Sequence, residues 1–290
     1  YGNNSFAGGV DHHIYSGAKT LALNGLYVAG SDGIVKTFSN PAGLNYLNGF
    51  EVELSVSDFL YQSTFESSTR GLFKSLREDD FGFSGGINWA VSDNFKASLS
   101  FQQVVNYNVS WPYANYYKQD SLSALLVFDF YNKLNINAIA AAAAYRMDNI
   151  LIGVSPVLYN VKNKIAFPQN NDLWSSGIGT AAYQFEYNLD AWAFGFVVGS
   201  IIEFSDELKI GLSIRSGFSA DLEGDAKSNM FSVTDSTVNQ TTITNSIEMP
   251  WIFSIGGVYS INPNLNLNLD FQYSTWGSTQ SSINNSFGNS

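Results

Sequence analysis

The stretch 261–276 alternates strictly between apolar and polar residues. After a turn at 262–264, apolar side chains occupy every second position from Leu265 to Tyr273, and the positions between them are polar. A period of two places these sets on opposite faces of a β-strand. About ten residues of tilted strand cross the hydrocarbon core of a bilayer, and aromatic residues suit its headgroup region. The pattern predicts a membrane-spanning strand, although strands of soluble sandwiches also alternate.

Similar stretches recur along the chain, and short turns alternate with long polar segments between them. The predicted strands are 50–57, 81–91, 95–107, 136–145, 150–159, 191–203, 208–217, 251–260 and 265–274. The tight turns fall at 92–94, 147–149, 205–207 and 262–264, and the long segments at 61–80, 108–135, 161–190 and 218–250. Such segregation of connection lengths is typical of an outer-membrane barrel, with turns in the periplasm and loops outside.

Charged residues indicate which face of the strands is the lumen. Glu51 and Glu53 share one face of the first stretch, and carboxylates facing lipid would be costly. Lys96 lies on the polar face of 95–107, and Arg215 ends the strand that follows the third tight turn. We predict all four as lumen charges, with the arginine balancing the acids. The alternative is that Lys118 or Arg215 pairs with the carboxylate head of a bound molecule.

Composition narrows the possible classes of protein. Only 13% of residues are charged, against about 25% in soluble domains. The net charge of −11 argues against nucleic acid as a partner, and the absence of Cys removes thiol chemistry and disulfides. No apolar run approaches the roughly 18 residues of a membrane helix, and 138–144 is too short. A closed barrel needs no such helix, because neighbouring strands satisfy its backbone.

Residues 1–47 differ from the rest, since they are rich in Gly, Ala and Asn and lack a long alternating run. We predict a compact segment outside the wall; its apolar residues argue against the alternative of a disordered leader. Pro41 cannot donate a ladder hydrogen bond and restricts Asn40, which suits a fixed corner where segment becomes wall. Because Tyr1 is not a starting Met, the chain is expected to begin at a processed or trimmed end.

This corner resembles the FadL family of outer-membrane transporters for hydrophobic compounds. Members carry a Gly-rich segment with a central Asp, here Asp32, followed by Asn-Pro-Ala, here Asn40, Pro41 and Ala42. Motifs at 85–90, 204–216 and 249–276 resemble later strands of the family in the same order. The resemblance implies an all-β fold, with an N-terminal hatch at 1–47 inside a transmembrane antiparallel β-barrel at 48–290. Related secretion-accessory barrels share a similar segment.

The number of strands departs from the family, whose barrels have fourteen. About nine are counted here, and an open wall would expose strand edges to lipid. We therefore expect the natural chain to continue beyond Ser290. The alternative is a smaller barrel, or a nine-strand wall closed by a partner.

Candidate residues for chemistry are few, and we expect no enzyme activity, metal or cofactor. His12 and His13 are adjacent, so in extended backbone they point to opposite sides. No G-x-S-x-G nucleophile motif is present. Asp221, Glu223 and Asp225 leave a calcium site open, but without EF-hand spacing.

Apolar and aromatic residues inside the long polar segments predict a surface that captures ligand. Family members capture ligand in a groove between extracellular loops and pass it to a pocket beside the hatch. Loop self-packing or an aromatic girdle at the membrane edge is the alternative. The predicted groove residues are Trp111, Tyr113, Tyr116, Leu122, Leu125, Leu126, Phe128, Phe167 and Trp174.

The resemblance implies a bacterial outer-membrane channel for passive uptake of hydrophobic small molecules, such as long-chain fatty acids or hydrocarbons. Ligand would leave sideways into the bilayer after the hatch moves. Val104 breaks the polar face of 95–107 and permits an irregularity there, and Pro156 is a second candidate bulge. The expected partners are the ligand and outer-membrane lipid or lipopolysaccharide. An accessory or structural barrel of a secretion or surface assembly, with a protein partner, and a soluble secreted β-protein remain alternatives.

Overall fold

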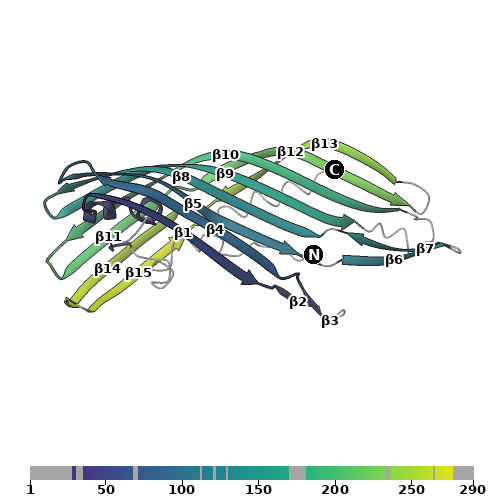
Figure 1. The fold of residues 1–290 in the computed structure, drawn as a ribbon, viewed down its shortest axis with the longest axis horizontal. Coiled ribbons are helices and arrows are strands. Elements are labelled where there is room, and N and C mark those ends of the chain that lie inside the picture. The colour runs from purple at the N-terminus through teal and green to yellow at the C-terminus, as the bar shows by residue number, and fades with distance from the viewer. Residues whose placement is uncertain are drawn as a thin grey trace.

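The alternating stretches form strands that pair in chain order as one antiparallel sheet (Figure 1). The computed structural model describes residues 28–30, 35–67, 71–111, 113–119, 122–128, 130–169, 181–232, 236–263 and 265–276. The strands along the path are β1 Phe50–Tyr61, β4 Glu78–Ala90, β5 Phe95–Ser110, β8 Tyr131–Met147, β9 Ile150–Gln169, β10 Ala181–Glu203, β11 Leu208–Arg215, β14 Ile252–Asn262 and β15 Leu265–Ser274. These are the nine predicted strands, so the prediction of an antiparallel wall is confirmed.

Two further strands, β12 Phe218–Ser232 and β13 Ser236–Met249, bring the sheet to eleven. The prediction of a long loop at 218–250 is therefore wrong. The pairs Arg215–Ile252 and Phe218–Met249 keep one register across the break between β11 and β12. The supposed loop is a hairpin that continues the wall beyond this break.

The other long segments also contain strands. The hairpins β2 Thr64–Ser67 with β3 Gly71–Lys74, and β6 Tyr113–Gln119 with β7 Leu122–Phe128, occupy much of two of them. β9 and β10 remain paired from Ile150–Ile202 to Gln169–Tyr183, so most of the third is wall as well. The short turns gather at one end of the molecule, and these hairpins project from the other (Figure 1).

The outer face of the wall is apolar. The apolar side chains of β15 that alternate from Leu265 to Tyr273 are 51–78% exposed. On β9, Ile152, Val154 and Leu158 are likewise exposed. Large apolar side chains can remain exposed on every second position only where the surroundings are themselves apolar, as in lipid.

Further along the same strands the alternation reverses its polarity. On β9 the exposed positions after Leu158 become Lys162 and Lys164, while Val161 is buried. On β12, Asp221, Glu223 and Asp225 are exposed, and Ala220, Leu222 and Ala226 between them are buried. The strands thus continue past the apolar band into water, with apolar side chains on the inner face.

Two short helices, α2 Val35–Ser39 and η1 Pro41–Tyr46, precede the wall and contact its inner face. They account for the helical structure of residues 35–47. Across the described ranges, no helix is both long enough and apolar enough to span a membrane.

We expect Val154→Arg to destabilise the protein, because Val154 lies in the middle of the exposed apolar row of β9. A charge at such a position costs about 2–4 kcal/mol when it faces the centre of a bilayer. Urea unfolding in lipid vesicles measures this cost. Lys164→Arg, on the same face beyond the apolar band, is the control and should be neutral; equal effects of the two substitutions would contradict the assignment of the band.

Candidate functional site

Four wall glycines lie directly against the N-terminal segment. Gly153 on β9 pairs with Gly199 on β10, and Gly211 on β11 pairs with Gly256 on β14. A Cβ on Gly199 would lie 1.9 Å from Oδ1 of Asn40. At Gly153, Gly211 and Gly256 a Cβ would likewise come closer than 3 Å to the segment or to Asp270. These four residues, which we call the glycine seat, let a second backbone approach the sheet closely.

Asn40 holds the segment in the seat. Its backbone is extended, at φ −144° and ψ 96°, as expected before a proline. Its Nδ2 donates to the carbonyls of Val28 at 2.7 Å, Ser200 at 3.2 Å and Leu212 at 3.3 Å. Its Oδ1 accepts from the Ala42 amide at 3.1 Å. One buried side chain therefore joins two parts of the segment to two wall strands.

Three of the four predicted gate residues are described. Asn40, Pro41 and Ala42 lie together, buried against the wall, with Pro41 as the first residue of η1. Asp32 lies outside the described residues. Of the predicted hatch segment, only 28–30 and 35–47 are described.

Small side chains on β8 make room for η1. Leu44 of η1 packs in a buried cluster with Ala142 and Ala144. Ala42 packs with Leu151 and Ile201 on the next two strands. The alanine-rich run of β8 thus serves as a shallow surface under the segment.

An ionic cluster holds the end of η1, and the sequence analysis did not single it out. The Tyr46 hydroxyl donates to Oε1 of Glu203 at 2.8 Å, and Arg146 pairs with Oε2 at 2.8 Å. Lys209 Nζ lies 3.4 Å from Glu203 Oε1 and 4.3 Å from the centre of the Tyr46 ring. Glu203 at the end of β10 therefore connects the segment to two wall cations.

The four predicted lumen charges do not form one group. Glu51 is exposed and Glu53 is half-buried on β1. Lys96 is buried, and its Nζ donates to the Ser92 carbonyl of its own turn at 2.9 Å. Arg215 is half-buried at the end of β11. The ion pairs at the segment centre instead on Glu203.

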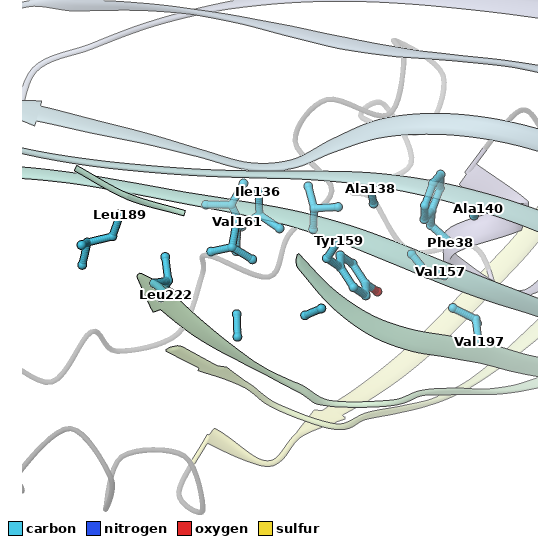
Figure 2. Packing of buried hydrophobic residues seen from close by; sticks show 14 residues of the cluster. Phe38, Ile136, Ala138, Ala140, Val157, Tyr159, Val161, Leu189, Val197 and Leu222 are labelled. Atoms are coloured by element: carbon cyan, nitrogen blue, oxygen red, sulfur yellow. The ribbon is translucent and has the colours of Figure 1, made fainter. Parts of the chain in front are cut away.

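A cluster of buried apolar side chains lies on the inner face of the wall and reaches the N-terminal segment at Phe38 (Figure 2). In Figure 2 it extends from Phe38 at one end to Leu189 and Leu222 at the other. At its centre the ring of Tyr159 stacks on that of Phe218, with centroids 4.2 Å apart. We call this set the inner cluster; its members are Phe38, Val104, Val105, Ile136, Ala138, Ala140, Val157, Tyr159, Val161, Leu189, Ala193, Val197, Ala220 and Leu222.

The predicted loop groove stays a prediction. The backbone register pairs Tyr113 with Phe128 and Tyr116 with Leu125 across the β6–β7 hairpin, which also carries Leu122 and Leu126. The side chains of this hairpin, and Trp174 altogether, lie outside the described residues.

Trp111 and Phe167 are half-buried at different places. The amide of Trp111 donates to the Phe130 carbonyl at 2.7 Å, which closes the base of the β6–β7 hairpin. The ring of Phe167 stacks on that of Phe185, with centroids 5.5 Å apart, and also meets Tyr187. Phe167 thus belongs to an aromatic row shared by β9 and β10.

The irregularity predicted at Val104 is confirmed. The register of β5 on β8 shifts between Gln103 and Val105, and all residues from Gln102 to Val105 are buried. A bulge that turns consecutive side chains inward explains this pattern. Two of these residues belong to the inner cluster.

The bulge predicted at Pro156 is wrong. The pairs Val154–Ala143 and Val157–Ala140 keep the same register on either side of it. Pro156 also pairs in register with Phe196 on β10. Pro156 has no amide hydrogen to donate, and the ladder to β8 is interrupted at this residue.

The wall divides next to Val104. The ladder between β4 and β5 ends at the pair Ser84–Gln102. Beyond it, β4 stays paired with β1 and β5 stays paired with β8. We call the space between residues 78–83 of β4 and residues 103–109 of β5 the fork.

Acidic side chains of the described residues do not gather into a metal site. Among them no group of three His, Asp or Glu side chains is placed to hold a metal ion. Asp221, Glu223 and Asp225, the possible calcium ligands, lie exposed along one face of β12. His12 and His13 lie outside the described residues.

An antiparallel wall with an apolar outer band and a segment seated on its inner face defines an outer-membrane β-barrel. Residues 6–287 match the family described as outer membrane protein transport protein (OMPP1/FadL/TodX). The chain belongs to this family of outer-membrane transport proteins.

Solved structures of similar fold support the architecture. The toluene transporter TodX of P. putida superposes with a TM-score of 0.78 at 17% identity, over 93% of this chain and 72% of that chain. The CymD monoaromatic hydrocarbon channel gives 0.69 at 14%, over 92% and 70%. The Ralstonia pickettii toluene transporter TbuX gives 0.68 at 16%, over 93% and 73%. At these identities the likeness establishes the fold, and a search among curated proteins gave no significant match.

We expect Gly199→Ala to release the segment from the wall, because the added methyl occupies the position of Asn40 Oδ1. Loss of the buried hydrogen bonds of Asn40 should cost roughly 1–3 kcal/mol. Hydrogen exchange of residues 40–46 measures the loss. Gly257→Ala is the matched control, since its nearest atom, the Lys209 carbonyl oxygen, lies 3.8 Å from the new Cβ. Unchanged protection in Gly199→Ala would show that the seat does not hold the segment.

We expect Glu203→Gln to loosen η1 by about 1–2 kcal/mol, since the substitution removes the charge that Arg146 and Lys209 share. The amides of 41–46 should exchange faster, and added salt should weaken the same contact in the unmodified protein. Glu207→Gln, at an exposed turn, should leave this exchange unchanged. If both variants behaved alike, the cluster would have no part in holding η1.

Proposed function

We propose that the protein carries hydrophobic small molecules, such as monoaromatic hydrocarbons or long-chain fatty acids, passively across the outer membrane. The observation that supports this best is the inner cluster. Barrels that conduct water and ions have polar interiors. Here a contiguous cluster of buried apolar side chains lies on the inner face of β5, β8, β9, β10 and β12, beside buried polar residues such as Gln102 and Ser155.

The ligands named for the structural neighbours belong to the same class of hydrophobic small molecules. Two of them are named as toluene transporters and a third as a monoaromatic hydrocarbon channel. The inner cluster is lined by aliphatic side chains, alanines and the stacked pair Tyr159–Phe218. Such a lining favours apolar ligands through burial of surface and distinguishes poorly among them.

In the proposed path, ligand is captured at the end of the wall that carries the β6–β7 hairpin. It then enters the inner cluster, which ends at Phe38 of α2 on the side of the N-terminal segment. Movement of residues 1–47, the proposed hatch, frees space beside the wall. The glycine seat suits this role, because backbone contacts and a few hydrogen bonds hold the segment there. The segment can leave the seat without any covalent bond being broken.

Exit in this scheme is lateral, through the fork. Val104 and Val105 belong to the inner cluster and also border the fork. On the outer face, Phe81, Phe83 and Phe101 are exposed beside it. An apolar ligand would therefore move from apolar side chains into lipid without returning to water.

Exchanging Val157 and Val197 for Thr tests the inner cluster, because each substitution keeps the shape and adds a hydroxyl. Both valines are buried, and an unpaired hydroxyl against apolar ligand should weaken binding of toluene and palmitate about tenfold. Scintillation proximity with purified protein measures the binding, and uptake in cells lacking their own channel measures transport.

The matched control is Val154→Thr with Val198→Thr, an exposed pair of Cα partners on the same two strands. This variant should bind ligand normally. Equal binding by both double variants would contradict an internal site. Copurification of a stable protein partner, with no apolar ligand bound, would instead favour an accessory barrel.

A further inference from the structure

We propose that Tyr61 is the tie that keeps the fork closed, and that its release controls exit of ligand. This inference rests on the proposed function, because the fork is there the exit. Tyr61 is the last residue of β1, and its half-buried side chain reaches past β4 to β5. It contacts the edge of β5, one of the two strand edges that face each other across the fork.

The Tyr61 hydroxyl makes two hydrogen bonds to the backbone of one residue. It accepts from the Asn108 amide at 2.8 Å, and it donates to the Asn108 carbonyl. In an antiparallel ladder, a hydrogen-bonded partner exchanges both bonds with one residue in the same way. Tyr61 therefore takes the place of a missing strand partner on this edge of β5.

Other contacts define the limits of the opening. At its far end the Leu76 amide donates to the Ser110 carbonyl at 2.7 Å, so the strands meet again there. Inside it, Asn106 Nδ2 reaches the Phe81 carbonyl at a long 3.4 Å. The fork is thus an enclosed window, and the bond from the Asn108 amide to the Tyr61 hydroxyl, at 2.8 Å, is shorter than the link between Asn106 and Phe81.

The position of Tyr61 depends on the base of the β2–β3 hairpin. Two residues further on, the Ser63 amide donates to Ser75 Oγ at 2.8 Å, and the Ser75 amide donates to the Ser63 carbonyl at 2.8 Å. Any displacement of this hairpin base is passed to Tyr61 through two residues of chain. The tie therefore links the end of the wall at which ligand arrives to the window through which it leaves.

Tyr61→Phe removes only the hydroxyl, so it tests the tie without emptying the space of the ring. Loss of two hydrogen bonds should make opening of the fork roughly tenfold more frequent. The Asn108 amide should exchange faster by about that factor, and uptake of radiolabelled palmitate and toluene should rise while equilibrium binding stays unchanged. Tyr259→Phe, exposed on the outer face of β14, is the control and should change none of these.

A cross-link provides the opposite test. The chain has no Cys, so Tyr61→Cys with Asn108→Cys introduces a single pair. A short cleavable thiol cross-linker should abolish uptake but leave ligand binding intact, and reduction should restore uptake. Normal uptake by the cross-linked protein would overturn the proposal.

The two proposals fail in distinguishable ways. If Asn108 exchanges faster in Tyr61→Phe but uptake stays at the level of the unmodified protein, Tyr61 is a structural link and the gate is refuted. If exchange does not change, the tie itself is refuted. If the unmodified protein neither binds nor takes up either probe, the proposed function fails, and the gating role with it.

Discussion

Contact with lipid is the constraint on which the rest of the structure depends. Each strand must present apolar side chains outward for the thickness of the bilayer, so the other half of its residues faces inward. Beyond the bilayer this demand ends and the alternation reverses, as Lys162 and Lys164 on β9 show. Buried residues beyond the bilayer, such as Val161 and Leu222, then add apolar side chains to the interior. One physical boundary therefore fixes both the apolar band and the position of the inner cluster.

The same constraint explains which elements could be predicted. Nine strands were readable, because lipid enforces apolar residues at every second position over their central parts. The strands β12 and β13 were not readable. The exposed positions of β12 carry Asp221, Glu223 and Asp225, so the stretch resembles a polar loop. A search for alternation of either polarity would have found them, because Ala220, Leu222 and Ala226 alternate with these acids.

The site was predictable only in part. Asn40 and Pro41 could be inferred, because proline restricts the residue before it and ends regular pairing. The sequence does contain a signal for the glycine seat that the prediction did not use. Lone glycines inside strands, such as Gly153 and Gly199, mark close approach of another backbone. The contact of Tyr46 with Glu203, 157 residues apart, depends on the curvature of the wall and has no local signature. The same holds for Tyr61 and Asn108.

The glycine seat has a consequence for how the N-terminal segment can diverge. At the seat the wall meets main-chain atoms of Val28, Ala29, Pro41 and Ala42 and the side chain of Asn40, and main-chain atoms are the same in every protein. Where the segment touches the seat through its main chain, its side chains are therefore free to vary, whereas the wall cannot accept even a methyl group at Gly199. The segment is therefore modular within limits: one that keeps Asn40, Leu44 and Tyr46 could be exchanged between barrels that keep the seat.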